Sequence, residues 1–543
     1  MSRDAVADQN TLRAIQSAAR AGNHSQAIEL AEAALEDGLE HPLLYNLAAL
    51  RLEHEGRVSE AEPLLRKAVQ LAPSDQGARN ALGLCLLRLE RPRDALLEFE
   101  ALIGLNPNLP FAHASRGSAL FALGSIPDAE ASYRRALELD PNQVVALAGL
   151  ANLASSRGAY PAAQMWAEKA LALLPEYTDA ILSLAAAELG QKQWQPAETR
   201  LRGLLSNTQL GSLQRAYAQG LLGDVLDAQG RPDEAFAAYS TSNQLQQEVY
   251  AGRFGQQPSA LEYVREMLRY FEGDAAPAWQ SRVPPDERPT GATGHVFLLG
   301  FPRSGTTLLE VILEGHPNVA SLEENESLID SVNEYMQRPQ DLERLLRAPP
   351  AVLKEFRAAY WKHVARAGLD VAGKMFVDKH PLNTLKLPLI ARLFPDARVL
   401  FACRDPRDIV LSCFRHRFRM SAPIYELLTL EGAAYYYDAV MRLMVRLSET
   451  LSLETCLVRH EDVVTGFARE MKRICDFLGL EWAPAMGDFA LRTQNRPWLT
   501  PSTAQLMRGL STEGLGQWRR YRSHMEPVLP VIDPWVKRFY YTD

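Results

Sequence analysis

A period of 34 residues runs through the first half of the chain and constrains its fold more than any other feature. Alanines and prolines each recur at this interval, and two residue types in one register indicate a true repeat. The alanines are Ala27, Ala61, Ala95, Ala129, Ala163 and Ala197, and the prolines are Pro73, Pro107, Pro141 and Pro175. A proline lacks an N–H and clashes with the preceding turn, so it ends a helix in each repeat.

Small residues at one position of the repeat indicate how its two helices pack. The residues at this position are Ala49, Gly83, Gly117, Ala151 and Ala185. A small side chain there lets two antiparallel helices approach closely. Where the first helix must turn into the second, the chain has Gly56, Gly124 and Gly158. A glycine suits the residue after a helix end, so each unit is predicted to be a helical hairpin.

This pattern resembles tetratricopeptide repeats from about residue 8 to residue 211, with a displaced copy near 216–249. We expect about seven hairpins, and residues 1–250 should form a helical solenoid. Stacked hairpins leave a concave groove, which would bind a polypeptide acceptor or an adaptor. Alternatively, the array only stabilises or dimerises the second half of the chain, because a repeat specifies shape and not a ligand.

Composition argues against several other classes of protein. The net charge of −8 gives no global electrostatic reason to expect nucleic acid or an anionic membrane as a partner. No stretch of 18 or more apolar residues could span a bilayer, and the first residues do not read as a secretion signal. Five cysteines without CxxC spacing are typical of reduced thiols. We therefore expect a cytoplasmic protein.

A second domain is expected after the repeat register is lost. Prolines gather between residues 251 and 291, which predicts a last helix around 260–271 and then a connector. From 292 to 543, short apolar runs alternate with helical stretches. The runs expected to be strands are 295–300, 374–378, 398–404 and 455–460. Such alternation is typical of an α/β domain with a central parallel sheet covered on both faces.

The segment GFPRSGTT at 300–307 joins the first of these strands to a helix. Backbone N–H groups and the positive end of the helix dipole attract an anion there. The loop is similar to the P-loop pattern GxxxxGK[ST], but Thr306 stands where the phosphate-binding lysine belongs. Kinases use that lysine on the transferring phosphoryl group. A sulfuryl group bears less charge than a phosphoryl group, so Arg303 with hydroxyls and amides can suffice without a metal. The loop therefore favours sulfuryl transfer over phosphoryl transfer.

The sequence PRSGTTLLEVILEGHPNVASLEENE resembles the 5′-phosphosulfate loop of tyrosylprotein sulfotransferases and of bacterial proteins that join tetratricopeptide repeats to a sulfotransferase domain. The resemblance extends with gaps from about residue 294 to 521. It implies 3′-phosphoadenosine 5′-phosphosulfate (PAPS) as co-substrate and a hydroxyl acceptor, with protein tyrosine the best guess. The residues that would bind the 5′ end are Arg303, Ser304, Gly305, Thr306 and Thr307.

The resemblance also implies a general base and two catalytic cations. A glutamate beyond the HP pair after the first helix is the base in these enzymes, and ungapped matching puts Glu324 there. Lys379, at an expected strand end, and Arg303 would stabilise the transferring group. Glu323 is a competing base, and His380 is a further alternative because imidazole has a suitable pKa.

Three later segments resemble the rest of a PAPS site. RVLFACRDPRDIVLSCF at 398–414 is similar to the 3′-phosphate signature, which implies that Arg404 and Ser412 bind the phosphate that ATP lacks. The other two segments, around 457–464 and 501–521, imply contacts from His460, Ser502, Thr503 and Trp518. Gln517 stands where relatives have a basic residue, and Arg519 or Arg520 could replace it.

The sequence is also compatible with three other functions. Glu326 occupies a position where the eukaryotic enzymes have a basic residue that faces acidic acceptors, so a glycan or small phenol is an alternative acceptor. A P-loop kinase is a second class of enzyme, although the missing lysine argues against it. A third reading is a repeat scaffold whose second half has lost activity.

Overall fold

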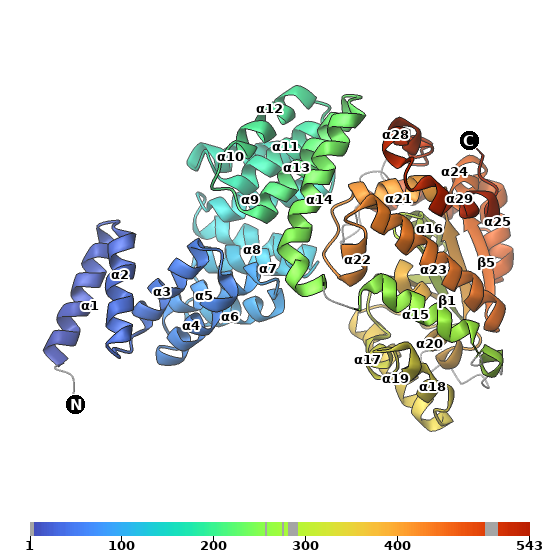
Figure 1. The fold of residues 1–543 in the computed structure, drawn as a ribbon, viewed down its shortest axis with the longest axis horizontal. Helices are drawn as coiled ribbons and strands as arrows, with labels where there is room; N and C mark the ends of the chain where they lie inside the picture. Colours follow the sequence, from blue (N-terminus) through green and yellow to red (C-terminus); the bar gives the residue numbers. More distant parts are fainter. Residues whose placement is uncertain are drawn as a thin grey trace. The chain divides into compact units, whose positions relative to one another are not determined.

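The computed structural model describes residues 5–255, 258–273, 276–280, 291–494, 506 and 509–542 (Figure 1). Its contacts divide the chain into two compact units, of which the first lies within Met1–Gln191 and the second contains most of the residues from Lys192 onward. Among the described residues, no helix is long and apolar enough to cross a membrane.

The first unit consists of helices that follow the predicted period. The helices that begin each repeat are α1 Ala5–Arg20, α3 Pro42–His54, α5 Gln76–Arg88, α7 Pro110–Ala122, α9 Val144–Ser156 and α11 Thr178–Gly190. The helices that follow them are α2 His24–Glu36, α4 Val58–Leu71, α6 Pro92–Leu105, α8 Ile126–Leu139 and α10 Tyr160–Leu173. From α3 to α11, each starting helix begins 34 residues after the last one, which confirms the repeat.

The small residues of the repeat are required by close helix packing. A Cβ atom at Gly83 of α5 would lie 2.5 Å from the ring of Phe99 on α6, and one at Gly117 of α7 would lie 2.7 Å from Tyr133 on α8. The aromatic ring of the second helix therefore fills the space that a larger side chain would need. Gly124, between α7 and α8, has a φ of 80°, as expected of a glycine after a helix end.

The second unit begins with four more helices, which are α12 Trp194–Leu205, α13 Ser212–Ala228, α14 Pro232–Phe254 and α15 Ala260–Glu272. Helices α13 and α14 are the displaced repeat copy, because a Cβ atom at Gly223 would lie 2.5 Å from the ring of Tyr239. Helix α15 is the predicted last helix. Ser259 and Glu262 form a capping box that fixes its start.

A five-stranded parallel sheet forms the centre of the second unit. Its strands are β1 Gly294–Gly300, β2 Val319–Glu323, β3 Met375–Lys379, β4 Arg398–Cys403 and β5 Glu454–Arg459, in the order β2-β3-β1-β4-β5. The four predicted strands are confirmed, whereas β2 was not predicted. The chain leaves β1 with β3 on one side and β4 on the other. This is the switch point where open α/β sheets bind ligands beyond the carboxyl ends of their strands.

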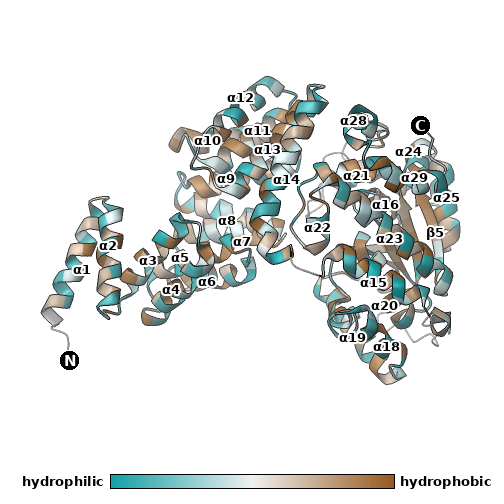
Figure 2. Ribbon diagram, viewed as in Figure 1, coloured by the Kyte–Doolittle hydropathy of each residue, from teal (hydrophilic) through white to brown (hydrophobic). Residues whose placement is uncertain are grey.

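Helices cover both faces of the sheet. The helices and short turns around it are α16 Thr306–Leu313, α17 Ile329–Tyr335, α18 Leu342–Leu346, α19 Pro350–Arg366, α20 Leu387–Leu393, α21 Pro406–Arg415, α22 Ala422–Glu426, α23 Leu430–Thr450, α24 His460–Thr465, α25 Phe467–Leu478, α26 Phe489–Gln494, α28 Arg522–Met525 and α29 Leu529–Arg538. Val296 and Leu298 of β1 pack with residues of α16 and α25. His295, on the opposite face of β1, contacts the aromatic rings of Tyr360 on α19 and Phe394 after α20. Figure 2 shows the apolar strands beneath helices with hydrophilic outer surfaces.

Replacing Gly83 with alanine tests the packing of the repeat helices. The added methyl group would overlap the buried ring of Phe99, so we expect Gly83→Ala to lower the free energy of unfolding by about 1–3 kcal/mol. Gly104→Ala is the matched control, because its Cβ would meet nothing within 4 Å and alanine stabilises a helix by about 0.5–1 kcal/mol. Urea denaturation followed by circular dichroism measures both. Equal shifts for the two variants would contradict the packing described here.

Candidate active site

The loop between β1 and α16 requires glycine at two positions. A Cβ atom at Gly300 would lie 2.5 Å from Ser304 Oγ and 2.7 Å from the carbonyl oxygen of Ala402 on β4. Gly305 has a φ of 98°, and a Cβ atom there would lie 2.6 Å from His460 Nδ1. The loop therefore lies tightly against β4 and the start of α24. Helix α16 begins directly after it, so the N–H groups of its first turn have no partners within the helix.

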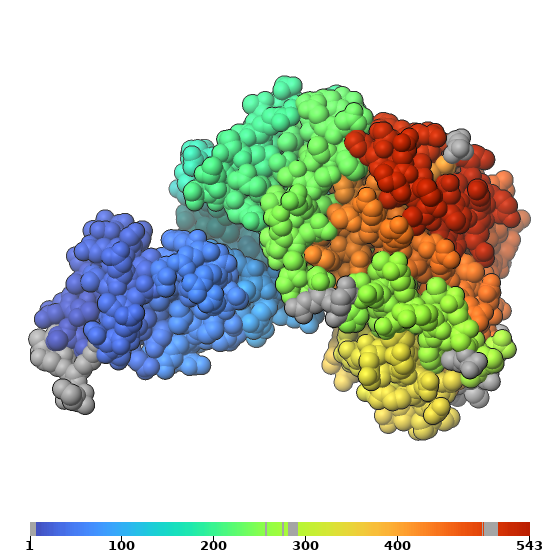
Figure 3. All heavy atoms as spheres, in the orientation of Figure 1, coloured from blue at the N-terminus to red at the C-terminus, as the bar shows by residue number. Residues whose placement is uncertain are grey.

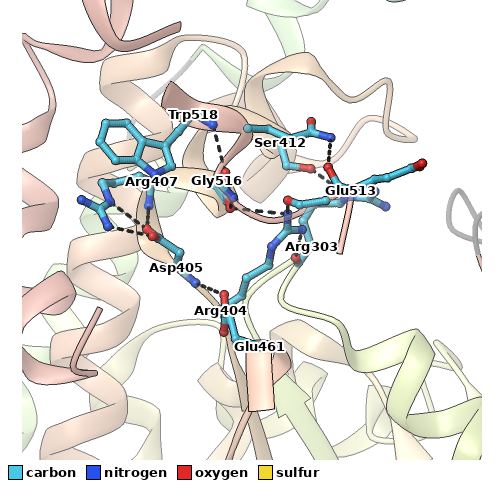
Figure 4. Close-up of polar contacts among 12 residues, drawn as sticks. Arg303, Arg404, Asp405, Arg407, Ser412, Glu461, Glu513, Gly516 and Trp518 are labelled. Carbon is cyan, nitrogen blue, oxygen red and sulfur yellow. Dashed lines mark hydrogen bonds and ion pairs between the residues drawn. The ribbon is translucent and has the colours of Figure 1, made fainter. Parts of the chain in front are cut away.

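Two arginines meet at the carboxyl ends of β1 and β4 (Figure 4). Arg303 has a φ of 70°, and its Nε donates a hydrogen bond of 3.1 Å to Ser412 Oγ on α21. Arg404 donates one hydrogen bond of 3.4 Å to the carbonyl oxygen of Arg303 and another to that of Gly514. The structure thus brings together the residues assigned to the 5′ side (Arg303) and the 3′ side (Arg404 and Ser412) of the donor.

Burial and mutual repulsion disfavour the positive charge in this region. Burial and the neighbouring charge of Arg404 lower the pKa of the Arg303 guanidinium to about 10. Burial, with the charges of Arg404 and Arg303, also lowers the pKa of His460 to about 3. A charge that has lost its water is stabilised when an opposite charge takes the place of that water. The region therefore favours the binding of an anion.

One cavity of about 920 Å³ connects most of the predicted site residues. Those that line it are Arg303, Gly305, Thr306, Thr307, Glu324, Arg404, Ser412 and His460. Ser304 and Lys379 do not line it, and Ser502 and Thr503 lie outside the described residues. Within the described part of the chain, Ser304 Oγ and Arg404 Nε are buried without a hydrogen-bond partner. Arg404 lines the cavity, so its Nε–H fits an anionic nucleotide, because phosphate oxygens accept hydrogen bonds.

A second charged cluster lies at the carboxyl ends of β2 and β3. Lys379 Nζ lies 2.8 Å from Glu323 Oε1, 2.8 Å from Glu324 Oε1 and 3.5 Å from Glu310 Oε2. The side chains of Lys379 and Glu310 are fully buried, whereas that of Glu324 is 53% exposed. Burial alone would lower the pKa of the Lys379 ammonium, but the three carboxylates outweigh this effect and raise the pKa. Lys379 therefore remains charged at neutral pH.

Glu324 follows β2 and presents its carboxylate to the cavity. Its φ of 42° lies in the left-handed region, which is uncommon for a residue with a side chain. Its N–H donates a hydrogen bond of 2.7 Å to the carbonyl oxygen of Lys379, so backbone and side chain are both held by the same residue. Burial would raise the pKa of Glu324, but the charge of Lys379, followed by those of His380 and Arg303, lowers it. An ionised carboxylate at the cavity can accept a proton.

The two alternative bases are placed differently. Glu323 is nearly buried beside Lys379 and does not line the cavity. His380 does line the cavity, and its Nε2 lies 3.1 Å from Glu326 Oε1. Lys386 Nζ lies 2.5 Å from the other oxygen of Glu326. The hydrogen bond from His380 and the charge of Lys386 lower the pKa of Glu326 to about 2, so Glu326 is an ionised and paired carboxylate.

The segment at 509–521, called the C-terminal segment below, is attached to the site through Asp408 of α21. The N–H groups of Gly516 and Trp518 donate hydrogen bonds of 2.7 and 3.0 Å to its carboxylate. The ring of Trp518 faces the Arg407 guanidinium at 4.2 Å and is not part of the cavity lining. Gln517 lines the cavity instead. The structure thus brings the segment to the cavity but does not bring the Trp518 side chain there.

Sequence reasoning missed two buried acidic residues of this site. Glu310 supports Lys379, and Asp408 holds the C-terminal segment. Glu310 is the one acidic residue within the apolar stretch LLEVIL. A charged side chain is rarely buried unless it has partners. An isolated acid on an expected core helix was therefore the signal that could have identified Glu310, whereas Asp408 ends the charged segment RDPRD and had no such signal.

Comparisons with known families agree with this architecture. Residues 295–484 match the sulfotransferase family. Four overlapping segments within residues 12–178 match the tetratricopeptide repeat. The chain therefore carries a sulfotransferase domain after tetratricopeptide repeats, as the sequence predicted.

Similar proteins include an uncharacterized protein of Aquifex aeolicus, which is 25% identical over 62% of this chain and 44% of its own length. Protein-tyrosine sulfotransferase A of Caenorhabditis elegans is 26% identical over 34% of this chain and 50% of its own length. The protein-tyrosine sulfotransferase of Drosophila melanogaster is 24% identical over 44% of this chain and 52% of its own length. The chain spans about half the length of these curated relatives. A tetratricopeptide repeat protein of Parabacteroides merdae is similar in structure, with 19% identity, 45% of this chain and 96% of that chain covered, and a TM-score of 0.35.

The depressed pKa of His460 predicts how acid affects stability. Folding keeps this imidazole neutral, whereas the unfolded chain takes up a proton below pH 6.5, so the stability that it contributes is lost as the pH falls below 6.5. Between pH 7.5 and 5, wild-type protein should lose about 2 kcal/mol more of its free energy of unfolding than His460→Gln does. Urea denaturation at the two pH values measures this difference. Equal losses in the two proteins would show that His460 is not buried beside the arginines.

Proposed function

We propose that this chain, which joins tetratricopeptide repeats to a sulfotransferase domain, transfers the sulfuryl group of PAPS to a hydroxyl group, with protein tyrosine as the preferred acceptor. One observation carries the proposal. A single cavity is lined both by the arginines Arg303 and Arg404 and by an ionised glutamate, Glu324, that a buried lysine holds. The arginines suit an anionic donor, and the glutamate suits removal of a proton from an acceptor.

The donor would bind with its anionic groups at the ends of β1 and β4. The loop at 302–307 would hold the 5′-phosphosulfate through its N–H groups, Arg303 and the hydroxyls of Thr306 and Thr307. Arg404 and Ser412 would hold the 3′-phosphate. This division is supported by the separate strands from which Arg303 and Arg404 extend, and by the buried Arg404 Nε that lacks a partner within the described residues.

Glu324 would act as the general base. Its carboxylate accepts the proton of the acceptor hydroxyl while the acceptor oxygen forms a bond to sulfur. The bond between that sulfur and the bridging oxygen of the 5′-phosphate breaks. The desulfated product, 3′-phosphoadenosine 5′-phosphate (PAP), leaves with the electron pair. Lys379, whose side chain is fully buried and does not line the cavity, keeps Glu324 ionised. The positive charges of Arg303, which lines the cavity, and of Lys379 would stabilise the charge that develops on the transferring group. PAPS supplies the sulfuryl group, and this chain supplies the base and the electrostatic field.

Protein tyrosine is favoured as the acceptor by the apolar part of the cavity lining and by the similar proteins. The lining includes Tyr263, Val332, Met336, Leu382, Leu385, Pro423 and Ile424. Apolar walls suit a phenol ring. Two of the similar proteins carry the name protein-tyrosine sulfotransferase. The repeat array would recruit the polypeptide in its groove, and the five buried free cysteines agree with a reducing cytoplasm.

A glycan or a small phenol is the second candidate acceptor, and Glu326 favours it. The carboxylate of Glu326 is paired with His380 and Lys386, so these three residues offer little net positive charge to an acidic peptide. Mass spectrometry of cells with and without the gene separates the candidates. Loss of tyrosine sulfation supports the protein acceptor, whereas unchanged tyrosine sulfation with loss of a sulfated glycan supports the other.

Replacing the proposed base tests the mechanism. With labelled PAPS and a tyrosine peptide, we expect Glu324→Gln to lower kcat by about 100- to 10,000-fold, which is the usual contribution of a general base. Binding of PAP should change little, because the substitution keeps the shape of the side chain. Glu323→Gln and His380→Gln are the comparison variants, and both should retain more transfer than Glu324→Gln.

Two results would contradict this account in different ways. Full transfer by Glu324→Gln, with loss in Glu323→Gln or His380→Gln, would move the base to that residue. Failure of the wild-type protein both to bind PAPS and to transfer sulfate to any peptide, phenol or glycan would overturn the proposed function.

A further inference from the structure

Two acidic residues of the last repeat helix pair lie against the cavity of the second unit. Asp224 and Asp227 are three residues apart on α13, so their side chains project from the same side of the helix. Both make ion pairs with arginines that line the cavity, and Asp224 lines the cavity itself. Figure 3 shows the atoms of α13 and α14 in green against the orange and red atoms of the later chain.

Asp227 is the centre of the larger of the two contacts. Its carboxylate lies 2.6 Å from Arg415 Nη2 and 3.0 Å from Arg520 Nη2, and it accepts a hydrogen bond of 2.7 Å from the Tyr521 hydroxyl. The Arg415 guanidinium also lies 5.3 Å from the ring centre of Tyr239 and 5.2 Å from that of Tyr521. The side chains of Asp227 and Arg415 are 12% and 16% exposed, so the pair is largely shielded from water.

The neighbouring contacts fix the chain that carries Arg415. Asp224 Oδ2 lies 2.7 Å from Arg417 Nη2, and Asn243 of α14 donates a hydrogen bond of 2.8 Å to the carbonyl oxygen of Phe414. A Cβ atom at Gly220 of α13 would lie 2.9 Å from Arg417 Cδ, so the helix backbone itself packs on this arginine. Helices α13 and α14 therefore hold the residues at 414–417, where α21 ends.

Arg415 reaches the anion-binding end of the cavity. Its Nη1 donates a hydrogen bond of 3.2 Å to Gln517 Oε1, in the same C-terminal segment that receives a hydrogen bond from Arg404. The charge of Arg415 also contributes to the lowered pKa of Arg303, after burial and Arg404. Arg415 thus belongs to the same group of positive charges as Arg303 and Arg404.

We propose that Asp227 is a positioning residue for donor binding, through which the last repeat helices hold the Arg415 guanidinium among the positive charges that line the cavity. This inference rests on the proposed function. A guanidinium has several N–H groups in one plane, so its orientation decides which of them face a ligand. Asp227 holds one edge of that plane, and the other edge is directed to Gln517 beside the cavity. The last repeat helices would then be part of the donor site as well as the end of the array.

Glu198 provides a matched control for loss of an ion pair. It lies on α12, its side chain is 8% exposed, and its carboxylate pairs with Arg202 and Arg231, each at 2.8 Å. None of these three residues lines the cavity. Glu198→Gln therefore removes a buried carboxylate charge from the same group of helices without touching the donor site.

Titration calorimetry of full-length protein with PAP tests the inference. We expect Asp227→Asn to raise the Kd for PAP about 10-fold or more, as for loss of a charge-assisted hydrogen bond. The KM for PAPS should rise to a similar extent while kcat at saturating PAPS stays within about 3-fold of wild type. Glu198→Gln should bind PAP like the wild type. The double variant with Arg415→Gln should bind PAP no more weakly than Arg415→Gln alone, because Asp227 acts through that arginine.

The contrary results are distinct from failure of the proposed function. Wild-type affinity for PAP in Asp227→Asn, with a lower midpoint of thermal unfolding, would assign Asp227 to stability alone and overturn the inference. Additive losses in the double variant, or an equal loss in Glu198→Gln, would also overturn it. Absence of PAP binding by the wild-type protein would instead overturn the proposed function itself.

Discussion

The rest of the site depends on the positive charges of Arg303 and Arg404, which are held close together, largely shielded from water, at the carboxyl ends of β1 and β4. Arg303 and Arg404 extend from loops after neighbouring strands; Gly300 lets the first loop lie against β4, and Gly305 lets it lie against His460. Burial lowers the pKa of Arg303, which means that keeping a charge there lowers the free energy of unfolding. An anionic ligand would recover that free energy on binding. The same loops that place the two arginines therefore also make the site favour an anionic ligand.

The order of the strands separates two kinds of charge. Arg303 and Arg404 follow β1 and β4, whereas Lys379 ends β3, and its partners Glu323 and Glu324 lie at the end of β2, on the other side of β1. Because the sheet is parallel, all of these residues meet at one edge. An arrangement with anion-binding groups and a base on opposite sides of a central strand suits transfer of an anionic group to a neutral hydroxyl. By the inference above, helices α13 and α14 would complete the anion-binding side through the ion pair of Asp227 and Arg415.

Much of this architecture could be predicted from the sequence, because regular patterns encode it. The repeat follows from alanines and prolines at fixed intervals, and four strands follow from apolar runs next to helical ones. Strand β2 was missed because VASLE is short and contains a buried serine, Ser321, in place of an apolar residue. The ion pairs of Asp227 and Glu310 could not be predicted, since they join residues 188 and 69 positions apart in the chain. Such contacts depend on tertiary packing, and no local pattern marks them.

Competition between nucleotides for the purified protein tests the central claim, that the buried arginines form a site for PAPS, most directly. Arg404 and Ser412 are expected to contact a phosphate that ATP lacks, and Thr306 replaces the lysine that ATP enzymes use. Calorimetry should therefore show PAP binding at least about 10-fold more tightly than ATP with magnesium, as expected for charge-assisted hydrogen bonds to one additional phosphate. Binding of ATP with magnesium as tightly as PAP, or more tightly, would contradict the account and favour a kinase.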